Sequence, residues 1–225
     1  MVYGEFVQAP AVKLCKELIE LLPKNQETVY LTNSGTEAIE GAIKLAKKVT
    51  GREELISALN SYHGSTHGSL SLLGSDYQKT GYGPMLPKVK FIKFNYENDL
   101  KKITNKTACV VLETIQGGAG FIVPDLNYLK KVKLRCDSMG ALLILDEIQP
   151  GFGRTGRFFG FEHFDVEPDI IVMGKGMGGG LPIGAFTSSH NLMNHFQDKP
   201  KLGHITTFGG NPIIAAASLA TLRVL

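Results

Sequence analysis

The sequence predicts a doubly wound α/β fold, in which a mostly parallel sheet carries helices on both faces. From residue 9 onward, segments of helical periodicity alternate with short apolar runs. Three of these runs, 108–112, 141–145 and 170–173, are apolar without alternation, as expected of strands buried on both faces. A chain of 225 residues, 43% hydrophobic and 20% charged, is long enough to bury such a core.

The chain is predicted to begin with a helix and a strand. Residues 11–22 have the helical period, and Pro23, which cannot continue a helix, ends them. The positions expected on the core face are Val12, Cys15, Leu18, Ile19 and Leu22. A strand is predicted next, at Thr28–Leu31.

Two further helices flank the apolar runs. A helix is predicted over 35–48, with Glu40 and Lys44 placed to support its solvated side. Its apolar stripe consists of Ile39, Ala42, Ile43 and Ala46. Between the first two runs, a helix that ends at Gly140 completes a β-α-β unit. Its apolar positions are Leu126, Leu129, Val132 and Cys136.

Residues 1–225 are predicted to form one domain, because no repeat, linker or low-complexity tract divides them. Both ends look cut. Met1 leads almost at once into a helix, and the final helix, which begins at Pro212, is still apolar at Leu225.

Composition argues against several classes of protein. The formal net charge of +3 is spread without a basic run, so nucleic acid is not an expected partner. No stretch of 18 apolar residues and no signal peptide is present, which predicts a cytoplasmic protein that is not bound to a membrane. The three cysteines stand singly in apolar patterns and are interpreted as core residues. His63 and His67 have metal-ligand spacing, but no third ligand is evident, so no metal is predicted.

Candidate chemical groups stand directly after the three apolar runs. In open α/β sheets a ligand lies beyond the carboxyl ends of the strands. Glu113 ends the first run, Asp146 ends the second, and Lys175 follows the third. Two carboxylates and one lysine are therefore expected at one edge of the sheet. Glu147 could be the functional acid instead of Asp146, because strand alternation does not say which face carries the ligand.

Two glycine-rich segments accompany these residues. The turn Ser34-Gly35-Thr36 leads into a helix and suits an anionic phosphate, although Ser and Thr are also favoured there as helix caps. The segment GKGMGGGLPIG around Lys175 lacks the spacing of a Walker motif, which argues against a nucleotide-binding module. A lysine at the dry end of a buried strand loses its proton readily and becomes an amine nucleophile. The alternative is an exposed lysine in a flexible loop.

Six motifs, in this order, resemble the class III aminotransferases of the aspartate-aminotransferase fold. They are NSGTEAIEGAIKLAKK, SYHG, LETIQGGAG, LDEIQPGFGRTG, DIIVMGKGMGGGLPIGA and TTFGGNP. The resemblance implies the large domain of the fold-type I transferases that use pyridoxal 5′-phosphate (PLP). It also implies that the N-terminal segment and the C-terminal small domain of the family are absent, so the chain is expected to bind cofactor poorly and turn over little.

The resemblance implies a role for each matching residue. Lys175 matches the lysine that forms a Schiff base with PLP and then acts as general base and acid. Asp146 matches the aspartate that pairs with the pyridine nitrogen and makes the ring an electron sink. The remaining matches are Ser34, Gly35 and Thr36 in the phosphate cradle, Tyr62 on the ring face, Gln149 near the ring hydroxyl, Glu113 and Gln116 in support, and Thr207 toward the phosphate of a neighbouring subunit.

The implied reaction transfers an amino group from an amine or ω-amino acid to a 2-oxo acid, in a homodimer with shared active sites. Two departures from the family bear on the substrate. His63-Gly64-Ser65 replaces the HGR of acetylornithine and ornithine-type members, and the stretch 116–119 has glycine where many members have glutamate. Alternatives within the same fold are an aminomutase, a racemase or a decarboxylase. A non-catalytic remnant that only dimerises is a further alternative.

Overall fold

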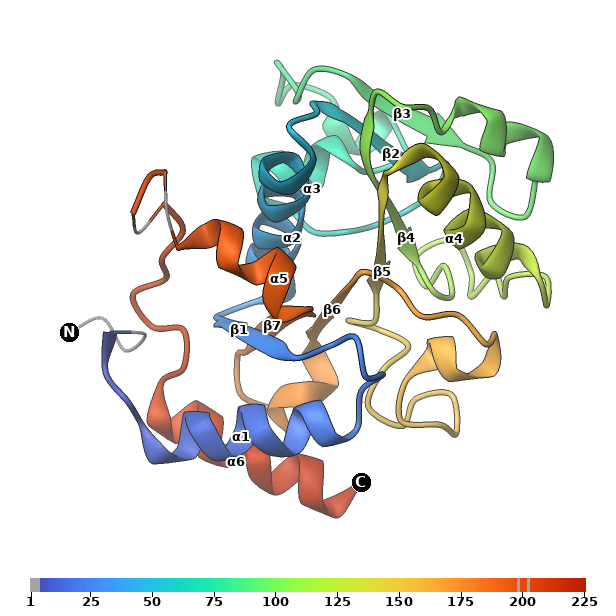
Figure 1. Ribbon diagram of the computed structural model, residues 1–225. Coiled ribbons are helices and arrows are strands. Elements are labelled where there is room, and N and C mark those ends of the chain that lie inside the picture. The colour runs from blue at the N-terminus through green and yellow to red at the C-terminus, as the bar shows by residue number, and fades with distance from the viewer. Residues whose placement is uncertain (1–4, 198, 202) are drawn as a thin grey trace.

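A seven-stranded sheet forms the centre of the molecule (Figure 1). The structure, a computed structural model, describes residues 5–197, 199–201 and 203–225. The strands are β1 (Thr28–Thr32), β2 (Glu54–Ala58), β3 (Val89–Ile92), β4 (Thr107–Glu113), β5 (Leu142–Asp146), β6 (Ile170–Gly174) and β7 (Gly184–Ser188). Their order across the sheet is β1-β7-β6-β5-β4-β2-β3.

The sheet is mostly parallel, as predicted. Strands β3, β2, β4, β5 and β6 pair in parallel, whereas β7 is antiparallel to both of its neighbours, β1 and β6. The predicted strands at 28–31, 108–112, 141–145 and 170–173 are confirmed as β1, β4, β5 and β6. Strands β2, β3 and β7 were not predicted, because polar residues or glycine interrupt each of them and none is a continuous apolar run.

Helices cover both faces of the sheet. They are α1 (Ala9–Glu20), α2 (Gly35–Thr50), α3 (His67–Ser71), α4 (Tyr128–Met139), α5 (His190–Met193) and α6 (Pro212–Val224). Short 3₁₀ turns are η2 (Tyr77–Lys79), η3 (Glu97–Lys102), η4 (Gly160–His163), η5 (Lys175–Gly178) and η6 (Asn194–Phe196). Buried side chains of α2 pack on one face of the sheet, and those of α1, α4 and α6 pack on the other. The predicted doubly wound arrangement is therefore confirmed.

The apolar stripe predicted for α2 is confirmed, because all four of its residues are buried. The predicted support between Glu40 and Lys44 is wrong. Glu40 Oε1 accepts hydrogen bonds from the backbone N–H groups of Gly68 and Ser69, and Lys44 Nζ donates to the carbonyl oxygen of Gly203. Both charged side chains thus hold neighbouring loops against the helix.

The core face predicted for the first helix needs correction. Leu14 and Leu18 are its fully buried residues, whereas Val12 is 52% exposed. Of the predicted residues, Leu18 is fully buried and Leu22 packs against the core, so the predicted face is confirmed except at Val12, and Leu14 is added to it. The helix also packs against α6. In the same way Leu126, 72% exposed, precedes α4 and is not on its core face.

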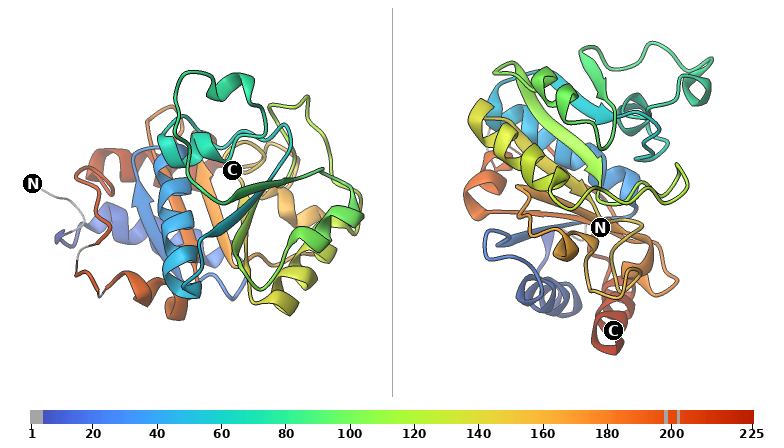
Figure 2. Two further views of the ribbon diagram at one scale, coloured as in Figure 1. Left: turned by 90° about the horizontal axis from the view of Figure 1, so that it is seen from above. Right: turned by 90° about the vertical axis from the view of Figure 1, so that its right-hand side faces the viewer.

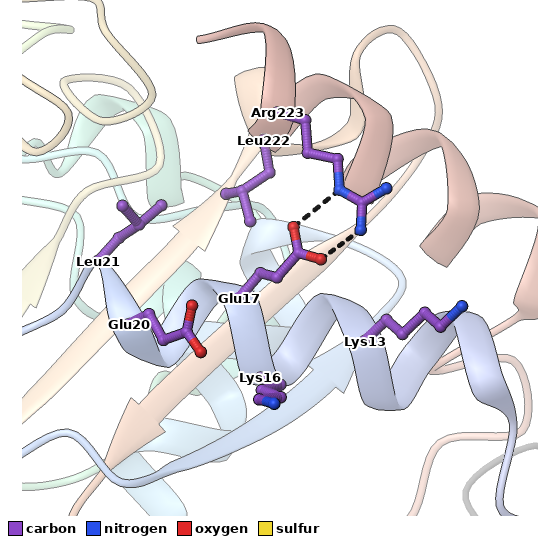
Figure 3. A pocket seen from close by; sticks show the side chains of 7 residues that line it. All are labelled: Lys13, Lys16, Glu17, Glu20, Leu21, Leu222 and Arg223. Atoms are coloured by element: carbon purple, nitrogen blue, oxygen red, sulfur yellow. Dashed lines mark hydrogen bonds and ion pairs between the residues drawn. The ribbon is translucent and has the colours of Figure 1, made fainter.

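Helices α1 and α6 lie side by side (Figures 1 and 2). A hollow at their surface is lined by Lys13, Lys16, Glu17, Glu20, Leu21, Leu222 and Arg223 (Figure 3). There Arg223 Nε donates to Glu17 Oε2 at 2.9 Å, and this ion pair links the first helix to the last. None of the predicted site residues lines this hollow. No helix within the described residues is long and apolar enough to cross a membrane.

Candidate functional site

A cavity of about 240 Å³ lies at the carboxyl edge of the central strands. Its lining residues are Gly35, Thr36, Tyr62, His63, Gly64, Ser65, Glu113, Asp146, Ile148, Gln149, Pro150 and Lys175. They come from the ends of β4, β5 and β6, from the start of α2 and from the loop after β2. Glu113 and Asp146 are direct partners in the register of β4 and β5, so the predicted convergence of strand-end groups is confirmed.

Asp146 is held from two sides at the floor of this cavity. Its Oδ2 lies 2.8 Å from Nδ1 of His63, and its Oδ1 accepts a hydrogen bond from the N–H of Ile148 at 3.0 Å. Asp146 is 3% exposed and His63 is 2% exposed. Nε2 of His63 is also buried and has no hydrogen-bond partner among the described residues. The pair fixes the carboxylate while leaving acceptor capacity on its oxygens.

Asp146 and Glu147 point in opposite directions, which bears on the alternative that the sequence left open. Asp146 lines the cavity. Glu147 is fully buried on the other side, where it accepts hydrogen bonds from the Thr114 hydroxyl and from the N–H groups of Gly160 and Phe161. Burial raises the pKa of Glu147 to about 7, although these three donors lower it.

Glu113 joins two loops at the rim of the cavity. Its Oε2 accepts from the N–H of Tyr62, and its Oε1 accepts from the N–H of Gly117, both at 3.0 Å. Burial raises the pKa of Glu113, and the neighbouring Asp146 charge raises it further, against the lowering effect of His63. Glu113 therefore links the loop that carries Tyr62 to the segment that begins at Gly117. Its supporting role in cofactor binding stays a prediction.

Lys175 follows β6 directly, at the open side of the cavity. Its backbone has φ +44, in the left-handed region that residues other than glycine rarely adopt. A Cβ on Gly174 would lie 3.3 Å from Cα of Gly35, so the end of β6 and the start of α2 meet backbone to backbone. Lys175 is exposed. The expectation of a dry environment for this lysine is thus wrong for the residues that the structure describes.

The N-terminus of α2 forms the wall beside the lysine. Ser34 is the N-cap, and its hydroxyl accepts from the N–H of Glu37 at 3.3 Å. Ser34 itself does not line the cavity, whereas Gly35 and Thr36 do. The Thr36 hydroxyl lies 2.6 Å from that of Ser69. Gly64 is required opposite it, because φ is +132 there and a Cβ would lie 2.3 Å from Thr36 Oγ1.

The remaining predicted residues divide into two groups. Tyr62, 42% exposed, and Gln149 line the cavity. Gln149 lies against Gly117, where a Cβ would be 2.2 Å from Gln149 Oε1. Gln116 and Thr207 do not line it: Gln116 Nε2 donates to the carbonyl oxygen of Leu59, and Thr207 is exposed.

Two cavity residues of chemical interest were missed by reasoning from sequence. His63 was considered only as a metal ligand, although its place next to Tyr62 in the SYHG motif was a usable signal. Ile148 forms an apolar wall, and its position two residues after Asp146 puts it on the same side of the chain. The cavity thus combines a lysine, a buried carboxylate, apolar and aromatic walls, and a helix N-terminus suited to an anion. The protein is thus an α/β protein whose cavity has walls and a helix N-terminus that suit a small, flat, anionic ligand.

Comparison with known proteins agrees with this description. The family model for class-III aminotransferases matches residues 1–225. The acetylornithine aminotransferase of Methanocaldococcus jannaschii is 43% identical over 223 residues, which are 96% of this chain and 55% of that protein. The chain belongs to the class III aminotransferase family.

Solved structures show the same fold. The ornithine aminotransferase of Toxoplasma gondii superposes with a TM-score of 0.92 at 31% identity, over 100% of this chain and 54% of that one. The taurine:2-oxoglutarate aminotransferase of Bifidobacterium kashiwanohense, described in complex with PLP and glutamate, gives 0.90 at 30% identity, over 99% and 56%. The chain spans about half the length of the relatives it matches.

Proposed function

We propose that residues 1–225 are the PLP-binding large domain of a transaminase that moves an amino group from an amine or ω-amino acid to a 2-oxo acid. One observation carries the proposal: Lys175, Asp146 and the N-terminus of α2 line a single cavity. Membership in the class III family supports it, and so does the PLP described in the taurine:2-oxoglutarate aminotransferase.

The residues present fit this cofactor. PLP, when bound, supplies an aldehyde that condenses with amines and a pyridine ring that withdraws electrons. Lys175 would hold the aldehyde carbon, and Asp146 would face the ring nitrogen. Gly35 and Thr36 would hold the phosphate with backbone N–H groups and a hydroxyl at the positive end of α2. The ring would lie between the side chains of Tyr62 and Ile148, which both line the cavity.

Asp146 would act through its charge. A carboxylate opposite the ring nitrogen favours the protonated ring, because opposite charges stabilise each other strongly where water is scarce. His63, with its proton on Nδ1, would donate to Oδ2 and fix the orientation of the carboxylate. The N–H of Ile148 fixes the other oxygen. The Asp146 carboxylate is thus held in one orientation before any cofactor binds.

Lys175 would hold and move a proton. As a free amine, its Nζ would take a proton from the carbon that bears the substrate nitrogen. It would then deliver that proton to the carbon that came from the cofactor's aldehyde. Its exposure at the open side of the cavity leaves the amine accessible to an incoming substrate. Glu113 and Gln149 would hold the rim of the cavity in place around the ring.

The rest of the proposal concerns substrate and assembly. We expect an amine or an ω-amino acid as donor. Ser65 lies where a carboxylate-binding arginine stands in acetylornithine and ornithine-type members, and this difference favours the donor without a carboxylate at that end. Thr207 is exposed and lies outside the cavity. We therefore assign it to the site of a second subunit in a homodimer.

A cytoplasmic location is supported by the three cysteines, which are unpaired.

Single-turnover absorbance spectroscopy tests the reaction type. The chain loaded with PLP is expected to show a visible band, and an amine donor is expected to convert it to the pyridoxamine form with one equivalent of carbonyl product. Addition of a 2-oxo acid is expected to restore the band. A racemised or decarboxylated substrate without any pyridoxamine form would contradict the assignment as a transaminase.

A further inference from the structure

Glu147 is a buried acid that the proposed chemistry does not use. It follows Asp146 in the chain but points away from the cavity, and its side chain is fully buried. Its Oε1 accepts from the Thr114 hydroxyl at 2.5 Å and from the N–H of Phe161 at 2.9 Å. Its Oε2 accepts from the N–H of Gly160 at 2.8 Å.

The partners of Glu147 require an acceptor at both oxygens. Two of them are backbone N–H groups, which donate only, and one lies on each oxygen. A glutamine of the same shape would place its NH₂ group against one of these N–H groups in either orientation. A buried donor that faces another donor loses its hydrogen bond and keeps the full cost of its desolvation. The surroundings of Glu147 therefore favour glutamate over glutamine, although the two side chains have nearly equal size.

The same contacts hold the turn after β5 on its side away from the cavity. Thr114 follows β4, and Gly160 and Phe161 begin η4. The carbonyl oxygen of Glu147 accepts from the N–H of Gly151 at 3.0 Å, and a Cβ on Gly151 would come within 2.6 Å of that oxygen. The turn between Asp146 and Gly151 is thus tied to β4, to η4 and to itself.

The other side of this turn forms one wall of the cavity. Asp146, Ile148, Gln149 and Pro150 all line it, so four of its lining residues come from five consecutive positions. A displacement of the turn would move the carboxylate, the apolar wall and the amide together.

We propose that Glu147 is a positioning residue, whose buried carboxylate sets the geometry of the Asp146–Pro150 turn and thereby the affinity and orientation of the bound cofactor. The inference rests on the proposed function of the cavity, because it assigns that turn to PLP binding.

Glu147→Gln tests this inference, with Glu54→Gln as the matched control. Glu54, the first residue of β2, is likewise buried, and its Oε1 accepts from a threonine hydroxyl, that of Thr107 at 2.7 Å. It differs in having an ion pair with Lys90, and it does not line the cavity. PLP affinity is measured by absorbance titration, and cofactor orientation by visible circular dichroism at saturating PLP. Glu147→Gln is expected to bind PLP roughly tenfold more weakly, the scale of one lost hydrogen bond to a charged group, with an altered dichroic band. Glu54→Gln is expected to keep the wild-type affinity and band.

Thr114→Val is the second variant, because it removes one donor and leaves the carboxylate and both N–H partners in place. It is expected to change affinity and dichroism in the same direction as Glu147→Gln, but less. Hydrogen exchange of the cofactor-free chain is expected to show faster exchange at the amides of Gly160 and Phe161 in Glu147→Gln.

Wild-type affinity and dichroism in Glu147→Gln, or equal losses in Glu147→Gln and Glu54→Gln, would overturn the positioning role. Failure of the wild-type chain to bind PLP would instead overturn the proposed function, and this inference with it.

Discussion

Replacement of His63 by leucine tests whether Asp146 is held as the structure shows. The change removes the donor that lies 2.8 Å from Asp146 Oδ2, while the N–H of Ile148 still serves Oδ1. A hydrogen bond to a charged group contributes about 1.5–3 kcal/mol. The variant also removes the unpartnered Nε2 of His63, which offsets a part of that loss. We expect the free energy of unfolding to fall by about 2 kcal/mol.

Urea unfolding monitored by circular dichroism measures this change, and a PLP titration accompanies it. His67→Leu is the control, because His67 is exposed in the same segment and its replacement should alter stability by less than about 0.5 kcal/mol. PLP binding to His63→Leu should weaken by about tenfold, since an unfixed carboxylate must be ordered when the cofactor binds. Equal stability and equal PLP affinity of the two variants would refute the account of Asp146.

Three further predictions follow from packing and ionisation. Gly64→Ala should lower the melting temperature by several degrees, because a Cβ would lie 2.3 Å from Thr36 Oγ1 at φ +132; an unchanged melting temperature would contradict the close approach. Phe159→Ala should reduce the free energy of unfolding by about 3–5 kcal/mol in a denaturant titration, because Phe159 is fully buried. Burial lowers the pKa of His204 from 6.5 to about 4. Between pH 6.5 and 4 the unfolded chain binds a proton at His204 that the folded chain does not. The free energy of unfolding should therefore be unaffected by His204 above pH 6.5 and should fall as pH drops toward 4, by less than about 2 kcal/mol after solvent screening. His204→Phe should flatten that part of the pH profile, and an unaltered profile would contradict the assignment.

Most of the correct fold prediction came from uninterrupted runs of apolar residues. The runs that became β4, β5 and β6 are uninterrupted because both faces of these strands are covered, so their pattern is visible without neighbours. Strand β7 begins with Gly184 and ends in Ser188, and its place depends on pairing with β1 and β6. Such pairing is a property of the tertiary structure, which a single short segment does not encode.

Helix faces were predictable where one contact dominates. The stripe of α2 packs mainly on the sheet, and its four predicted residues are buried. The prediction for α1 placed Leu18 on the core face correctly but included the exposed Val12 and missed the buried Leu14; this helix also packs against α6, some 200 residues away in sequence. Periodicity identifies a helix, but two packing partners together decide its inward side.

The sequence predicted where the candidate site lies, but not which side chains contact one another within it. The rule for strand ends placed Glu113, Asp146 and Lys175 at one edge, and all three line the cavity. The choice between Asp146 and Glu147 required knowledge of which face lies under α2. The partnership of His63 with Asp146 joins residues 83 positions apart, so no local pattern could reveal it. The roles of all the predicted site residues in binding stay predictions, and Ser34 and Thr207 do not line the cavity.

The central claim is that Lys175 is the residue that holds PLP. The most direct test is borohydride reduction of the PLP-loaded chain, followed by proteolysis and mass spectrometry of the labelled peptide. The account predicts one phosphopyridoxyl group, attached to Lys175, and none in Lys175→Ala. A label on a different lysine, or undiminished labelling of Lys175→Ala, would contradict it.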